Sequence, residues 1–173
     1  MRWCCTLAVL LGLLAPANAT AVPLTITLSP ANTRIRFRAF ALSLLPMDGG
    51  FARFTGSLVY DPARPGFCHV LMVVDVASLR LPSPAITADV LSRHFLDPED
   101  FPRLRFEGAC RDGSVAGILR LHGVSRPFLL RVSPRWRHFV ATGRLRRALW
   151  GVTAQPLLAG PMVRIRVLVH LAP

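Results

Sequence analysis

The sequence predicts an all-β protein, an eight-stranded antiparallel barrel with a short helical insertion between strands three and four. Three observations lead to this prediction. Most of the chain after residue 20 alternates apolar and polar residues with a period of two, as half-buried strands do. Proline and glycine corners separate these segments at regular intervals. Closure of the strands into a barrel leaves no unpaired edge.

The predicted strands cover residues 34–39, 51–60, 68–78, 103–110, 117–132 as a hairpin of two, 135–145 and 162–171. Segment 68–78 is apolar on both faces, so we expect another element to cover part of its outer face. The candidate cover is the insertion, residues 85–102, where Asp97 would cap a short helix with Pro98 at its first position. Glu99 and Asp100 would then form an acidic first turn.

The first 19 residues have the pattern of an export signal. One charge, Arg2, precedes an apolar run over residues 3–15, followed by Pro16 and the small residues Ala17 and Ala19. The run is shorter than the roughly 20 residues that cross a bilayer. We therefore expect cleavage after Ala19, a single mature domain over residues 20–173, and a periplasmic location.

The chain is strongly basic, with a formal net charge of +12, and every basic side chain other than histidine is an arginine. The arginines are spread over alternating strand positions, such as Arg34, Arg36 and Arg38, and few aromatic residues lie between them. This arrangement favours a solvated outer barrel face over a nucleic-acid site, so we expect no nucleic-acid partner. Peripheral contact with an anionic membrane remains open.

Residues 20–173 contain two cysteines, Cys68 and Cys110, and export permits a disulfide between them. If the third and fourth strands pair antiparallel with Val74 opposite Leu104, Cys68 falls opposite Cys110 on the same face. We predict a Cys68–Cys110 bridge. The alternative is two buried free thiols, because cysteine also packs as a small hydrophobic residue.

Catalytic motifs are missing from the sequence: it has no His-Glu-x-x-His, no Cys-x-x-Cys and no glycine-rich phosphate loop. The five histidines are far apart along the chain, with no pair at metal-ligand spacing. Helix initiation accounts for the acidic cluster formed by Asp97, Glu99 and Asp100. We expect a non-enzymatic protein without metal or cofactor.

The interior is the remaining candidate for a site. An eight-stranded barrel is either filled by its own side chains or holds one extended ligand, and side-chain parity does not choose between the two. If a ligand binds inside, the inward-facing candidates to contact it are Phe37, Phe54, Leu58, Met72, Leu104, Phe106, Leu119, Leu121, Phe128 and Ile165.

Two blocks of sequence carry a family resemblance. Residues 94–106 read His-Phe-Leu-Asp-Pro-Glu-Asp-Phe-Pro-Arg-Leu-Arg-Phe, and residues 117–132 read Gly-Ile-Leu-Arg-Leu-His-Gly-Val-Ser-Arg-Pro-Phe-Leu-Leu-Arg-Val. Together they resemble the YceI-like family of secreted, lipocalin-like polyisoprenoid-binding proteins. The resemblance implies an apolar tunnel that holds the tail of an isoprenoid quinone or polyprenyl phosphate, in a periplasmic carrier or sequestering protein.

The resemblance also matches Arg147 to a motif arginine of the family, which makes it a candidate polar residue at the mouth of the tunnel. The alternative for Arg147 is a surface charge at a strand end. A second function stays open as well: a filled barrel that acts as a basic envelope scaffold, docking an anionic membrane or a membrane redox partner through its arginine-rich outer face. The sequence carries no signal for an oligomeric state.

Overall fold

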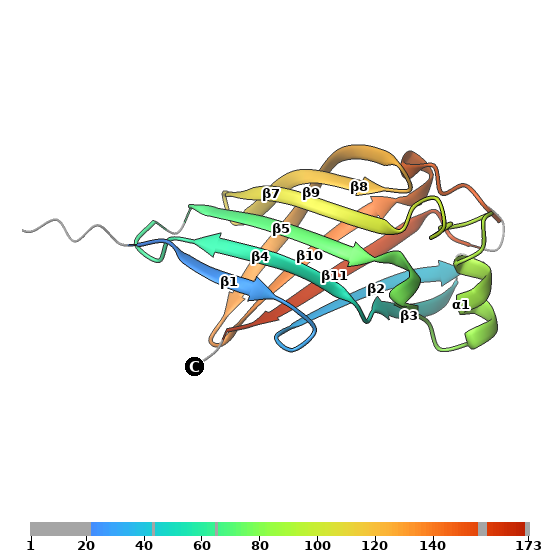
Figure 1. The fold of residues 1–173 in the computed structure, drawn as a ribbon, viewed down its shortest axis with the longest axis horizontal. Coiled ribbons are helices and arrows are strands. Elements are labelled where there is room, and N and C mark those ends of the chain that lie inside the picture. Colours follow the sequence, from blue (N-terminus) through green and yellow to red (C-terminus); the bar gives the residue numbers. More distant parts are fainter. Residues whose placement is uncertain (1–21, 43, 65, 156–158, 172–173) are drawn as a thin grey trace, which may run out of the picture.

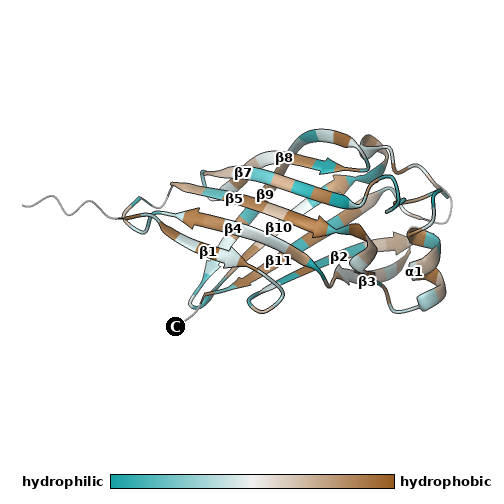
Figure 2. Cartoon of the chain, viewed as in Figure 1, coloured by the Kyte–Doolittle hydropathy of each residue, from teal (hydrophilic) through white to brown (hydrophobic). Residues whose placement is uncertain are grey.

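The fold of the described residues, seen in a computed structural model, is one curled antiparallel sheet with an α-helix at one end (Figure 1). The structure describes residues 22–42, 44–64, 66–155 and 159–171, so the predicted export signal lies outside the described residues. Hydrophilic and hydrophobic residues alternate along β7 (Figure 2), whereas β5 is apolar on both faces. The all-β prediction is confirmed.

Eleven strands are present within the described residues, in the sheet order β1-β4-β5-β7-β8-β9-β10-β11-β2-β3-β6. Their bounds are β1 (Leu24–Leu28), β2 (Thr33–Ala41), β3 (Leu45–Phe51), β4 (Phe54–Tyr60), β5 (Cys68–Asp75), β6 (Leu79–Arg80), β7 (Arg103–Arg111), β8 (Ser114–Leu121), β9 (Val124–Arg135), β10 (His138–Arg146) and β11 (Met162–His170). Because β1 and β6 end this order, the sheet is a curled half-barrel. The predicted count of eight strands and the predicted full closure are wrong.

The segment predicted as one strand over 51–60 explains part of the difference. β3 ends at Phe51 and β4 begins at Phe54, because the two residues between them bond to a distant serine. The amide of Ala52 donates to the Ser78 carbonyl at 3.1 Å and that of Arg53 to the Ser78 hydroxyl at 3.0 Å. Ser78 itself lies in a short 3-10 helix, η1 (Val76–Ser78), which ends the strand predicted to run to residue 78.

The helical insertion is present between β5 and β7, but its helix starts elsewhere than predicted. α1 (Pro84–Val90) has Ser83 as its N-cap and Pro84 in its first turn. Asp97 caps no helix: it is buried and has a φ of 44°, and its carbonyl accepts the Phe101 amide at 2.7 Å in a turn. The insertion lies mainly across one end of the barrel (Figure 1). It covers the outer face of β5 only in part, as predicted: Phe101 and Pro102 lie near Val73, and Leu71 and Val73 are half-buried.

The antiparallel strand order gives the barrel two distinct ends. The connections β4–β5, β7–β8 and β9–β10 lie at one, which we call the turn end. α1, the connections β2–β3 and β8–β9, and the 3-10 helix η2 (Arg147–Trp150) lie at the other, the helix end.

A disulfide joins Cys68 on β5 to Cys110 on β7, with their Cα atoms 4.9 Å apart. The register of these strands is the predicted one, with Val74 opposite Leu104 and Val70 opposite Gly108. The bridge therefore ties two neighbouring strands together close to the turn end.

Candidate functional site

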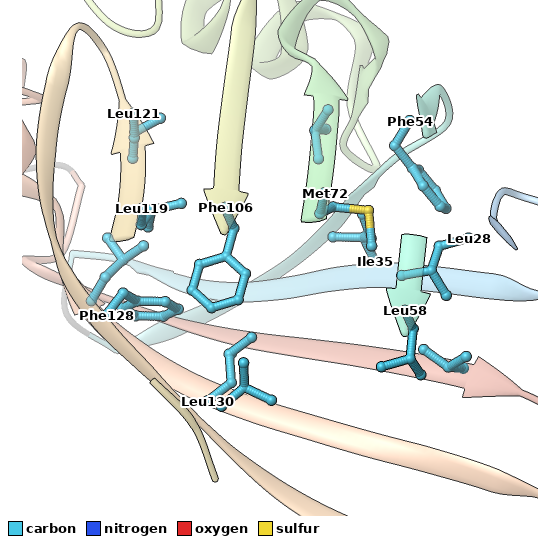
Figure 3. Close-up of a cluster of buried hydrophobic side chains, with 14 of the residues drawn as sticks. Leu28, Ile35, Phe54, Leu58, Met72, Phe106, Leu119, Leu121, Phe128 and Leu130 are labelled. Atoms are coloured by element: carbon cyan, nitrogen blue, oxygen red, sulfur yellow. The ribbon is translucent and has the colours of Figure 1, made fainter. Parts of the chain in front are cut away.

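The interior of the half-barrel is hollow. A cavity of about 840 Å³ extends from the turn end to the helix end. Its walls are the inward faces of the strands, and the side chains there point toward one another across the interior (Figure 3). This volume lies within the range of small-molecule sites in proteins, roughly 300–1,000 Å³. Side-chain parity left open whether the barrel is filled by its own side chains or hollow, and the structure shows a hollow barrel.

Most of the predicted contact residues line this cavity. They are Phe37, Leu58, Met72, Leu104, Phe106, Leu119, Leu121, Phe128 and Ile165, together with Arg147. Phe54 faces inward and is buried in the core cluster, but it does not line the cavity. The structure therefore brings together residues from strands far apart in sequence, as the period-two pattern predicts.

Three aromatic rings pack edge to face where the cavity approaches the helix end. Phe106 and Phe128 have ring centroids 6.2 Å apart at 88°, and Phe128 and Trp150 have centroids 6.2 Å apart at 87°. The Trp150 indole donates to the Leu119 carbonyl at 3.0 Å, which fixes the ring. Gly143 is required here, because a Cβ at this position would lie 2.6 Å from the Phe128 ring. Sequence reasoning missed the role of Trp150, since no periodicity applies to a 3-10 turn.

The cavity meets solvent at the turn end, because residues that line it there are themselves exposed: Pro62, Gly66, Phe67, Asp112 and Pro134. The negative charge of the buried Asp61 beside this mouth is balanced by an arginine. Its carboxylate accepts hydrogen bonds from Arg64 Nε at 2.6 Å and from the Ala63 amide at 2.9 Å. The bond from Arg64 is the main reason that the pKa of Asp61 lies below its usual range.

At the helix end the insertion lies over the cavity, but exposed residues line it there too: Ile86, Asp89 and Gln155. Ile86 and Val90 of α1, Phe95 and Leu96 of the insertion, and Arg147 line the cavity at this end. The insertion is therefore part of the site, although its own helix starts at Ser83 rather than Asp97.

Arg147 lies at the helix end and is 7% exposed, so it is not a surface charge at a strand end. Its guanidinium donates to the carbonyls of Gly160 at 3.1 Å, Val152 at 3.0 Å, Ala159 at 2.8 Å and Gln155 at 3.5 Å. It also stands over the Phe95 ring, 5.2 Å from the centroid. Burial lowers the pKa of this guanidinium from its ordinary value. The side chain holds the segment after η2 against the barrel, and a sequence pattern gives no sign of partners 5 to 13 residues away.

Among the described residues, no three histidine, cysteine or acidic side chains gather into a metal-binding group. In the same part of the chain, no helix has the length and apolar character needed to cross a membrane. The described lining of the cavity is mainly apolar, and the buried Arg147 lies at its helix end.

A hollow all-β half-barrel with a mainly apolar interior has the form of a protein that encloses an apolar ligand. Residues 26–171 match the model of the YceI-like domain, and the chain belongs to that family.

Sequence relatives and solved structures agree with this assignment. A UPF0312 protein of Shewanella baltica (strain OS185) is 27% identical over 132 residues, covering 72% of this chain and 69% of the relative. BcnA of Burkholderia cenocepacia has a similar fold, with a TM-score of 0.70 at 17% identity, over 83% of this chain and 98% of that one. A polyisoprenoid binding domain from Saccharophagus degradans follows with a TM-score of 0.62 at 14% identity, over 86% of this chain and 98% of that one. At these identities the two structures show the fold.

Proposed function

We propose that this protein binds an isoprenoid lipid, an isoprenoid quinone or a polyprenyl phosphate, with the prenyl tail inside the cavity. In this role it serves as a periplasmic carrier or sequestering protein and catalyses no reaction. The observation that carries the proposal is the apolar cavity of about 840 Å³ that runs from one end of the barrel to the other. The family assignment and the polyisoprenoid-binding neighbour support the same ligand class.

The energetics of tail burial suit such a ligand. Each methylene removed from water contributes roughly 0.8 kcal/mol. A micromolar complex needs about 8 kcal/mol, so a few isoprene units are sufficient even after the cost of association. Because this contact is apolar, the affinity depends on the tail more than on the headgroup.

The first experiment asks what the protein carries. The protein is purified from its own envelope without detergent, extracted with organic solvent, and the extract is analysed by mass spectrometry. We expect a prenyl lipid in stoichiometric amount. An empty extract, together with failure of the folded protein to take up added prenyl lipid, would overturn the proposal.

A pair of adjacent substitutions tests the cavity itself. Ala141 lines the cavity, whereas Thr142, the next residue on β10, is exposed on the outer face. Ala141→Phe fills space that the tail would occupy, so we expect it to reduce lipid loading by about tenfold or more. Thr142→Phe adds the same ring on the outside and should leave loading unchanged. Equal loading in both variants would place the lipid outside the barrel.

A further inference from the structure

The most exposed large apolar side chain of the described residues is Trp136, which is 96% exposed. It lies in the two-residue turn between β9 and β10, where Arg135 is paired with His138. Arg135 and Arg137 on either side of it are exposed as well. The tip is held in place from behind, because the Leu171 amide donates to the Arg137 carbonyl at 3.0 Å. An indole between two arginines thus projects from a fixed hairpin.

This hairpin stands beside the mouth of the cavity. Pro134 and Phe139, which pair across β9 and β10 just behind the tip, both line the cavity. The hairpin lies at the turn end, together with the β4–β5 connection and its exposed Phe67 (Figure 1). An object that binds the Trp136 tip is therefore brought close to the opening.

The strands that carry the tip have no acidic side chain. No aspartate or glutamate follows Asp112 in the sequence, so arginines are the permanently charged side chains of β8 through β11. Arg131 adds a further exposed cation on β9, four residues before Arg135. The potential at this end favours an anionic partner.

We propose that the β9–β10 hairpin docks the turn end of the barrel onto an anionic phospholipid bilayer. Trp136 enters the interfacial region, where indole rings concentrate, and Arg135 and Arg137 bind lipid phosphates. The docking surface goes beyond ligand binding itself, and it faces the mouth of the cavity toward the membrane.

Two other classes of partner fit the tip less well. A stable protein interface buries about 800 Å² on each side, much more than one projecting turn offers. Single-stranded nucleic acid binds to a series of stacking aromatics along a basic groove, and the tip has a single ring. A bilayer requires only a short apolar anchor with flanking cations.

The test is flotation of the full protein with phosphatidylcholine vesicles, with and without phosphatidylglycerol, at low and high salt. We expect binding to the anionic vesicles only, weakened by salt. Arg135→Gln with Arg137→Gln should reduce the binding constant by about thirtyfold, at about fivefold for each arginine near the surface. Trp136→Ser should reduce it by about tenfold. The vesicle-induced blue shift of tryptophan fluorescence, measured on the protein that begins at Thr20 and so lacks Trp3, should disappear in Trp136→Phe, because Trp150 is buried in any case.

Matched controls lie at the helix end. Arg103→Gln with Arg120→Gln removes two exposed charges there, and Leu44→Ser with Leu45→Ser removes two exposed apolar residues, 80% and 61% exposed, from the ends of the β2–β3 connection. Both should bind vesicles like the unaltered protein. The proposal is overturned if the unaltered protein ignores anionic vesicles, if either control pair loses as much binding as the hairpin variants, or if Trp136→Ser binds normally.

Lipid content measured on the same variants separates this proposal from the proposed function. Hairpin variants that still carry a full prenyl lipid but no longer bind vesicles support both. An empty barrel that binds vesicles through Trp136 would retain the docking surface and remove the carrier role.

Discussion

Two walls of the barrel both have apolar inner faces but differ in their outer faces: on one wall the arginines form ion pairs with carboxylates, and on the other most do not. On β5, β7 and the turns that flank them, which we call the paired wall, arginines meet carboxylates: Arg53 with Asp75 at 2.8 Å, Arg64 with Asp61 at 2.6 Å and Arg105 with Glu107 at 2.7 Å. The outer faces of β10, β11 and β2, the cationic wall, carry Arg34, Arg36, Arg38, Arg144, Arg164 and Arg166. Within the described residues, only Arg38 of this second set has an acidic partner, Asp48.

The cationic wall places like charges directly opposite each other. In the strand registers, Arg164 lies between Arg144 and Arg38, and Arg166 lies opposite Arg36. Opposed like charges destabilise a sheet by a few tenths of a kcal/mol or more for each pair. The fold is therefore stabilised by interior packing and by the hydrogen bonds between strands. The arginines instead give this surface a positive potential that attracts anionic partners. Four predictions break or sharpen this comparison.

The largest effect is expected from the disulfide, which cross-links the paired wall. Replacing both Cys68 and Cys110 with alanine opens a loop with a sequence separation of 42 residues. The chain-entropy model gives a loss of about 4 kcal/mol in the free energy of unfolding for a loop of this size. Urea denaturation measures it, and reduction of the unaltered protein should give a similar loss. If reduction changes nothing while the double variant is destabilised, packing of the sulfur atoms, not the cross-link, stabilises the wall.

The next effect concerns the one arginine of the described structure that is buried. Arg147→Met leaves the carbonyls of Val152, Ala159 and Gly160 without their donor, so we expect a loss of about 3 kcal/mol in the free energy of unfolding. Arg164→Met on the cationic wall removes an exposed arginine and should change it by less than about 0.5 kcal/mol. Similar losses for the two variants would show that the arginines of the cationic wall support the fold too.

Much of this arrangement follows from the sequence, because burial of one strand face imposes a period of two. That pattern predicts which residues of β2, β7 and β11 face inward, and it predicts the register of Val74 with Leu104 and hence the Cys68–Cys110 pair. These inferences need only the pleat of a strand and an antiparallel neighbour.

What the sequence did not reveal depends on contacts between distant segments. Parity gives the direction of Phe106 or Ile165 but not the distance to the opposite wall, so it leaves the cavity undecided. Ser83 and Asp97 are both good helix caps locally, but a helix follows Ser83 whereas Asp97 has a positive φ and begins a turn. The break between β3 and β4 depends on Ser78, 25 residues from Arg53.

Acid should act mainly on the paired wall. The hydrogen bond and charge of Arg105 lower the pKa of Glu107, and the bond from Arg64 lowers that of Asp61. Since these folded-state pKa values lie below the unfolded ones, the stabilisation is complete above the unfolded pKa of about 4 and is lost as the pH falls through the folded values. Denaturation midpoints should therefore fall from roughly pH 5 to pH 2, with a smaller fall in Glu107→Gln. An unchanged slope in that variant would mean that Glu107 is not held ionised by Arg105.

The smallest effect has the opposite sign. Arg166 faces Arg36 and has Arg164 two residues away on the same face, so Arg166→Thr relieves repulsion and keeps a residue suited to strands. We expect the free energy of unfolding to rise by about 0.5 kcal/mol at low salt. The gain should vanish in 1 M salt, where the Debye length is about 3 Å. Arg105→Thr on the paired wall is the matched change and should destabilise, because it removes the partner of Glu107. If Arg166→Thr destabilises as well, the cationic wall is stabilised by packing of its arginine stems, and the two walls differ in sequence but not in how their side chains support the sheet.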